Sequence, residues 1–139
     1  MSKYQAAFEK MNQLDCMLKG MPVNRIPHEL LFRVIEKIEG LGMIYFVRDG
    51  HNVRATKCTP EIEKVIGIPQ SGIEGYLLTD FVKIEPEEVW RSIQHVDKHG
   101  FMVKSMMLGT VRIPTRAWIV RIDDGVYFEI VWRLEDEID

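Results

Sequence analysis

The sequence predicts an α+β domain in which a five-stranded antiparallel sheet with short crossover helices follows an N-terminal helical extension. Three observations support this fold class. Apolar residues recur at helical spacing before residue 40, strand-like alternation prevails after residue 100, and Asp-Gly turns at 49–50 and 124–125 fit hairpins. We expect the helical extension to span residues 1–27 and the sheet-containing domain to span residues 28–139.

The first predicted helix begins at Ser2, a good N-cap, and runs to about Leu18, before Gly20 and Pro22 end it. Two interpretations of this helix stay open. It either docks on its own domain or pairs with a second copy, because its heptad pattern is too short to decide for a coiled coil. Its apolar stripe consists of Tyr4, Ala7, Phe8, Met11, Leu14 and Leu18.

A second helix is predicted after Pro27, which suits the first helical position, and it ends at Gly40 and Gly42. The apolar period then changes, because residues 43–47 are a β-branched and aromatic run typical of a strand. A returning strand at residues 51–56 completes a hairpin. The buried stripe of this second helix consists of Leu30, Leu31, Val34, Ile35 and Ile38.

Two helical segments are predicted between this hairpin and the last strands. Thr59 as N-cap and Pro60 in the first turn begin a helix of about two turns, which Gly67 ends. A helix that short must be held by its neighbours. A longer helix begins at Pro86 and stops at Gly100, and its buried side carries Val89, Ile93 and Val96 with Trp90 beside them.

Three strands are predicted at about residues 101–108, 115–122 and 126–134. The charged residues Arg121, Glu129 and Arg133 are assigned to the outward face, so alternation assigns their neighbours inward. The residues predicted to face inward are Trp118, Val120, Ile122, Phe128, Ile130 and Trp132. The outward face then still carries an apolar stripe of Ile119, Tyr127 and Val131, which needs a cover such as the N-terminal helices.

This order of elements, together with four short motifs, resembles the PAS family of sensory domains over residues 28–134. The motifs are IYFVRDG at 44–50, TPEIEKVIG at 59–67, GYLLTDF at 75–81 and DDGVYFEIVWR at 123–133. The resemblance implies a sensor, in which a ligand, cofactor or partner biases the sheet and the change passes to its outer face or flanking helices. The common His-Pro pair before the long helix is replaced by Glu-Pro.

A cavity is expected between the sheet and the crossover helices. Alternation directs the strand residues inward, and helical spacing brings two residues of the short helix to meet them. Such pockets are mostly apolar with a few polar groups, for which Tyr76 and Ser105 are the candidates. The predicted apolar lining consists of Ile44, Phe46, Ile62, Ile66, Met107, Trp118, Phe128 and Ile130.

Two cofactors are weighed because of the resemblance. Haem-bearing relatives place an axial ligand on the long helix, where His95 is the better candidate, although His95 and His99 also fit solvated surface residues. Light-sensing flavin relatives carry their reactive cysteine in an Asn-Cys-Arg-Phe-Leu-Gln run, which is missing here. Cys58 is therefore interpreted as a packing residue, and Cys16 and Cys58 as free thiols.

Composition narrows the function further. A net charge of −3 with scattered Lys and Arg argues against nucleic-acid binding, and no apolar stretch is long enough for a membrane span. The charged N-terminal segment predicts a cytoplasmic location. Known catalytic motifs are missing, and no acid is expected to face inward on a strand, so the sequence predicts no enzyme.

Three functions remain from the sequence. The leading hypothesis is a sensory module that binds a small apolar or amphipathic ligand, followed by a cavity-poor dimerisation or docking domain and by a haem or flavin redox sensor. We also expect a homodimer. Its interface would use Tyr4, Phe8, Met11 and Leu18 of the first helix, together with the outer-face stripe of Ile119, Tyr127 and Val131.

Overall fold

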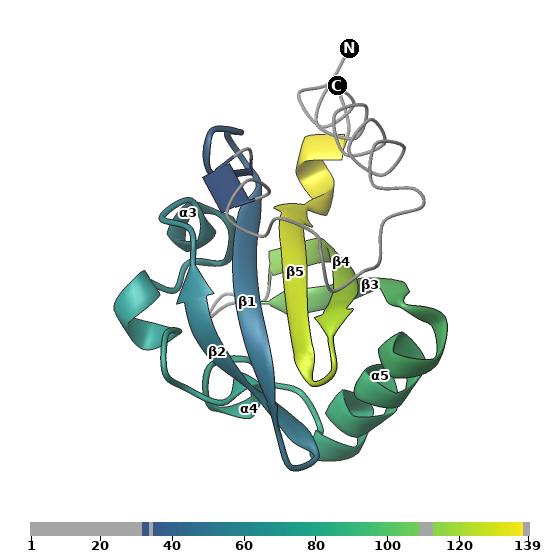
Figure 1. Cartoon of the computed structure of the whole chain (residues 1–139). Helices are drawn as coiled ribbons and strands as arrows, with labels where there is room; N and C mark the ends of the chain where they lie inside the picture. Colours follow the sequence, from purple (N-terminus) through teal and green to yellow (C-terminus); the bar gives the residue numbers. More distant parts are fainter. Residues whose placement is uncertain (1–31, 34, 109–112, 138–139) are drawn as a thin grey trace.

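The computed structural model describes residues 32–33, 35–108 and 113–137, so the predicted first helix and the extension at 1–27 lie outside the described residues. The described part is a five-stranded sheet in the order β2-β1-β5-β4-β3, in which every neighbouring pair is antiparallel. The predicted α+β fold class is confirmed (Figure 1). The strands are β1 Gly42–Asp49, β2 Asn52–Cys58, β3 Phe101–Leu108, β4 Ile113–Asp123 and β5 Val126–Arg133.

The crossover between β2 and β3 joins the two opposite edges of the sheet and therefore passes over one of its faces. Its helices contact β1, β2, β3, β4 and β5, and we call the side that they cover the helix face. Among the described residues, no helix is long and apolar enough to cross a membrane. The helical elements are α3 Ile62–Ile66, η2 Gln70–Gly72, α4 Leu78–Phe81, α5 Pro86–His99 and, after β5, η3 Leu134–Glu137.

The long helix α5 forms as the sequence predicts. Pro86 occupies its first turn, and Gly100 ends it with φ of 88°, a left-handed conformation that suits glycine. Val89, Ile93 and Val96 recur at helical spacing and are buried against the sheet. The apolar side of α5 therefore packs on the helix face of the sheet, and its polar side lies in solvent.

The predicted N-cap role of Thr59 is wrong. The side-chain Oγ1 of Thr59 accepts a hydrogen bond from the backbone N–H of Met43 at 3.0 Å, and Thr59 is completely buried. Its backbone N–H also donates to the carbonyl of Met43 at 2.9 Å, so Thr59 extends the pairing of β1 with β2. The short helix α3 starts later, with Glu61 as N-cap and no side-chain capping bond.

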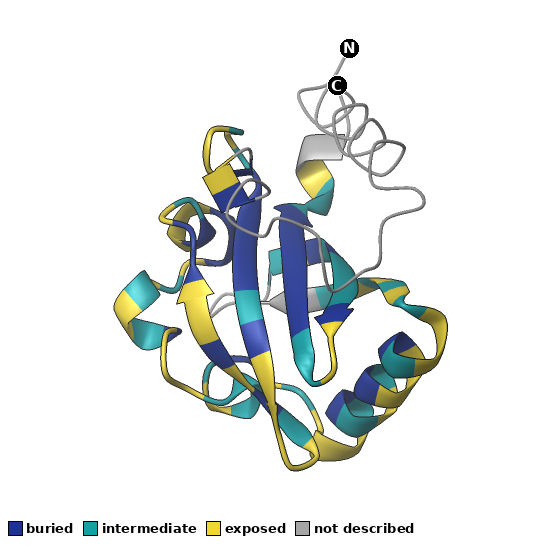
Figure 2. Cartoon of the chain, viewed as in Figure 1, coloured by how far each residue is buried: buried dark blue, intermediate teal, exposed yellow. Residues whose placement is uncertain are grey.

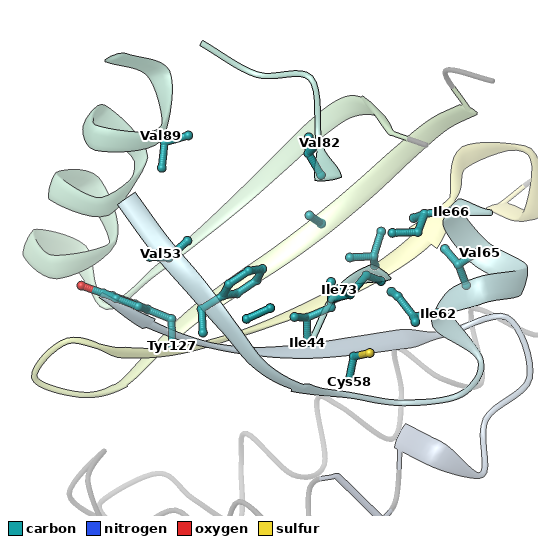
Figure 3. Packing of buried hydrophobic residues seen from close by; sticks show 14 of the residues in the cluster. Ile44, Val53, Cys58, Ile62, Val65, Ile66, Ile73, Val82, Val89 and Tyr127 are labelled. Carbon is teal, nitrogen blue, oxygen red and sulfur yellow. The ribbon is translucent and has the colours of Figure 1, made fainter. Parts of the chain in front are cut away.

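Both faces of the sheet carry a hydrophobic core, and Figure 2 shows β5 buried over most of its length and β1 buried mainly in its first half. The core on the helix face includes Ile44, Phe46, Ile62, Tyr127 and Val131, with side chains of α3 and α5 (Figure 3). The core on the opposite face, here called the outer face, consists of Phe32, Ile35, Leu41, Met43, Ile122, Phe128, Ile130 and Trp132.

The predicted facing of β4 and β5 is therefore reversed. Trp118, Phe128 and Ile130 pack in the outer-face core, whereas the supposedly outward Ile119, Tyr127 and Val131 pack on the helix face. The same correction moves Val120, Ile122 and Trp132 to the outer face. The predicted facing is wrong because it assumed that charged residues face solvent. In the structure, the charged residues of β4 and β5 have partners or line a cavity on the helix face.

Two arginines show this directly. The Arg133 guanidinium donates hydrogen bonds to the carbonyls of Val65 and Lys64 at 3.0 and 2.7 Å, and so satisfies the end of α3. Arg121 lies 3.8 Å from the carboxylate of Asp97 on α5. The outer face is covered partly by Phe32 and Ile35, and the predicted burial of Ile35 is confirmed, although Ile35 does not cover the stripe of Ile119, Tyr127 and Val131.

The contact between β1 and α3 depends on Gly42. A Cβ atom there would lie 3.0 Å from the Cα of Ile62 and closer still to its Cδ1, so the backbone of α3 would have to move. We expect Gly42→Ala to lower the free energy of unfolding by about 1–3 kcal/mol, measured by urea denaturation. Gly72→Ala is the control, because its Cβ would meet the movable Cγ2 of Ile68 at 3.1 Å. Equal losses for both variants would contradict a tight β1–α3 contact.

Candidate ligand cavity

A small apolar cavity of about 50 Å³ lies on the helix face, between the sheet and the segment from α4 to α5. Strand β1 contributes Phe46, β2 contributes Val53, and the other strands contribute one or two residues each. The helical wall comes from α4, the following loop and α5. The lining residues are Phe46, Val53, Leu78, Val82, Ile84, Val89, Ser92, Ile93, Val96, Lys104, Met106, Ile119, Tyr127 and Glu129.

Most polar groups of the cavity already have protein partners. The Tyr127 hydroxyl donates a hydrogen bond to Asp97 at 2.6 Å. The Lys104 ammonium forms an ion pair with Glu88 on α5 and donates to the Ser92 hydroxyl at 3.5 Å. The cation and both hydroxyls are therefore engaged at the wall formed by α5.

Glu129 is the exception. It lies in the middle of β5, between Ile44 of β1 and Ile119 of β4, and is 5% exposed. Among the described residues, its carboxyl group makes no hydrogen bond or ion pair. Burial raises the pKa of Glu129 from 4.5 to about 7, against a smaller lowering by the charge of Lys104. The cavity thus contains one unpartnered carboxyl group.

Strand alternation predicts that Glu129 faces solvent, and the expectation that no strand carries an inward acid is wrong. Periodicity could not find this residue, since Tyr127, Phe128, Ile130, Val131 and Trp132 are all buried around it. The sequence feature that could have identified Glu129 is the nearly continuous apolar run of residues 126–132 around it. A strand with apolar residues on both faces is covered on both sides, and a lone acid within it must then be buried.

The structure brings only part of the predicted cavity together. Phe46 lines it, and Ile44, Ile62 and Ile66 pack in the same helix-face core without lining the cavity. Trp118, Phe128 and Ile130 lie on the other side of the sheet. The two polar candidates are also misplaced: Tyr76 is 49% exposed, and Ser105 is exposed on β3. Met107 pairs with Pro114 through the backbone, and its side chain lies outside the described part.

A polar cluster fastens α5 to the sheet beside the cavity. Asp97 of α5 accepts the Tyr127 hydrogen bond and lies 3.8 Å from both Arg48 of β1 and Arg121 of β4. Arg48 also lies 4.9 Å from the ring centre of Trp90. Because these contacts join α5 to three strands, any ligand that shifts α5 must strain this cluster.

The fold is similar to solved LOV structures, and LOV domains are PAS-family domains. A glycine variant of RsLOV matches with a TM-score of 0.53 and 11% identity, over 77% of this chain and 67% of that chain. An RNA-binding light-oxygen-voltage receptor matches with 0.55 and 13%, over 82% of this chain but only 36% of the receptor. A fungal LOV domain photoreceptor matches with 0.51 and 11%, over 79% and 91%.

These matches confirm the inferred PAS resemblance at the level of the fold. No protein-family model matches the sequence, and no curated protein matches it. At 11–13% identity the similarity is one of fold.

The cavity does not fit a flavin. Its volume is about 50 Å³, whereas pockets for ligands of drug size measure roughly 300–1,000 Å³. Cys58, the cysteine within the described part, is buried at the end of β2 and does not line the cavity. His95 and His99 are exposed on α5, with ring centres 4.4 Å apart, so neither is directed into the cavity as a haem ligand would be.

The interpretation of Cys58 as a packing residue gives a testable expectation. Burial and then the nearby Glu74 carboxylate raise the pKa of its thiol to about 12. In a Cys16→Ser variant, Cys58 should react with a disulfide reagent at pH 8 on the order of a thousandfold more slowly than in denaturant, because so little thiolate forms. A native rate close to the denatured rate would show that the end of β2 opens readily.

Proposed function

We propose that this chain is a PAS-like sensory module that binds a small ligand between α4, α5 and the sheet, and that it acts in the cytoplasm by binding rather than by catalysis. The observation that carries this proposal is the apolar cavity with one unpartnered carboxyl group, that of Glu129. A buried polar group without a partner is costly, and its persistence is typical of a functional site.

Binding is favoured over catalysis by the state of the neighbouring polar groups. General acid–base chemistry needs a second group in reach of the reacting atoms. Lys104 and Tyr127 are the candidates, and Glu88 and Asp97 engage them. We propose that ligand binding changes the position of α5, because α5 contacts both Lys104 of the cavity and the Asp97 cluster. This change in α5 would transmit the signal.

The test is a ligand-observed NMR screen of the full chain with a library of small fragments. Ile119→Phe fills the cavity, whereas Val47→Phe adds a similar volume at an exposed position of β1. We expect fragments that bind the wild type and Val47→Phe but not Ile119→Phe, with all three proteins folded by circular dichroism. Fragments that bind Ile119→Phe equally well, or an absence of binders to the wild type, would contradict the proposal.

A second candidate function is dimerisation or partner docking. It is favoured by Phe101 and Val103, which are 55% and 56% exposed on the edge strand β3. The stripe of Ile119, Tyr127 and Val131 cannot form the dimer interface, because these residues pack inside the helix-face core. We propose a homodimer in which the first predicted helix and this edge associate.

Sedimentation velocity tests the dimer. The full chain should sediment as a dimer, and deletion of residues 1–20 or the double change Phe101→Ser with Val103→Ser should shift it toward a monomer. A matched change on the exposed side of α5, Glu87→Ser, should leave the dimer intact. A full chain that is monomeric throughout the concentration range would contradict this candidate.

A further inference from the structure

We infer that the cavity selects a small amphipathic cation, whose ammonium group binds the Glu129 carboxylate and whose short apolar body fills the space beside α5. This inference rests on the proposed function and names the chemical class of its ligand.

The position of Glu129 gives the first step. Its backbone is fixed by pairing on both sides, with Ile44 and with Ile119, so the side chain cannot leave the helix face without breaking the sheet. It lines the cavity and is 5% exposed. A carboxylate can accept several hydrogen bonds, and within the described part of the chain Glu129 accepts none through its side chain. A ligand can supply the donors that this carboxylate lacks.

The surrounding charges give the second step. Lys104 is the cation of the lining, and Glu88 holds its ammonium group at the α5 side. The Tyr127 hydroxyl is directed to Asp97, which Arg48 and Arg121 also approach. The charge of Lys104 acts on Glu129 without forming an ion pair with it, so above pH 7 the Glu129 carboxylate presents a negative charge to the cavity.

This charge discriminates among ligands. An anion would meet a like charge at close range, which raises its free energy of binding. A purely apolar molecule would displace water and leave the carboxylate without donors. An ammonium group supplies both the opposite charge and three N–H donors, and charge-assisted hydrogen bonds of this kind are the strong ones.

The volume gives the third step. A cavity of about 50 Å³ has room for roughly three to five water-sized groups, since each needs about 10–15 Å³. The apolar walls of the cavity include Ile119, Phe46 and the α5 residues Val89 and Ile93. An apolar body of about four carbon atoms fits this space, which is why we choose butyl compounds as probes.

The experiment compares n-butylammonium, 1-butanol and butanoate as ligands of the full chain, by NMR titration at pH 8. We expect n-butylammonium to bind about tenfold more tightly than 1-butanol, at the lower end of what a hydrogen bond to a charged group contributes, and butanoate to bind most weakly. In Glu129→Gln the preference for the amine should disappear while 1-butanol still binds. Glu129→Met should behave in the same way, and Glu87→Gln on the exposed side of α5 should resemble the wild type.

The outcomes separate this inference from the proposed function. If 1-butanol binds the wild type as tightly as the amine, the cavity binds ligands but the inference is wrong. If butanoate binds best and Lys104→Met abolishes that binding, the cavity takes anions and the inference is again wrong. If no probe binds either the wild type or Glu129→Gln, both the inference and the proposed function are overturned.

Discussion

Glu129→Gln is expected to raise the free energy of unfolding by about 3 kcal/mol at pH 8. The carboxyl group is 5% exposed, and burial raises its pKa from 4.5 to about 7. At pH 8 the folded protein must therefore hold an ionised group in apolar surroundings. An amide has nearly the same shape and no charge, so the variant avoids this penalty.

The pH dependence fixes the sign of this effect. Below pH 4.5, the ordinary pKa, Glu129 is protonated in both the folded and the unfolded chain. As the pH rises toward 7, the unfolded chain loses this proton first, so the stability contribution of Glu129 declines. Above the folded pKa the decline is complete and the penalty stays constant.

Urea denaturation at pH 5 and pH 8 measures this difference. The variant and the wild type should differ by less than about 1 kcal/mol at pH 5 and by about 3 kcal/mol at pH 8. Glu87→Gln, at an exposed position, should change little between the two pH values. A wild type that is more stable than Glu129→Gln at pH 8 would show that the carboxylate has a strong partner in the folded protein.

Trp132→Ala is expected to lower the free energy of unfolding by about 3–5 kcal/mol, the usual cost of truncating a large buried aromatic residue. Trp132 is 1% exposed in the outer-face core, together with Ile130, Phe32 and Ile35. The loss combines the removed apolar contact with the cavity left between the sheet and the segment before β1.

Tyr76→Ala is the matched control for this prediction. Tyr76 is also aromatic, but it is 49% exposed, so its truncation should change stability by no more than about 0.5 kcal/mol. Guanidinium denaturation of both variants gives the comparison. Similar small losses at the two positions would mean that the outer face has no core of its own.

The outline of the fold could be predicted from local signals. The Asp49-Gly50 turn, the change of apolar period before β1 and the Pro86 and Gly100 limits of α5 each depend on residues close in sequence. These signals are short-range, so they gave the number of strands and the order of elements. Thr59 shows the limit of such reasoning. Its hydroxyl suits a helix N-cap, but the hydroxyl oxygen accepts a hydrogen bond from the backbone N–H of Met43, sixteen residues away.

The facing of β4 and β5 could not be predicted in the same way. Alternation identifies a buried face only when the other face is polar. On β5 the residues from Tyr127 to Trp132 are all buried, because the crossover helices cover one side and Phe32 and Ile35 lie on the other. The two faces of β5 are then equally apolar, and the assumption that the charged Glu129 faces solvent selects the wrong face. The predicted cavity lining was built on this reversed facing. It therefore included Phe46 correctly but omitted Glu129 and Lys104.

The most direct test of a ligand cavity on the helix face is a methyl NMR titration of the full chain with n-butylammonium and with 1-butanol. We predict that methyl signals of the cavity residues Val89, Ile93 and Ile119 shift, while those of Ile122 and Ile130 in the outer-face core stay unchanged. Shifts confined to Ile122 and Ile130, or no shifts with either compound, would contradict a ligand site between α5 and the sheet.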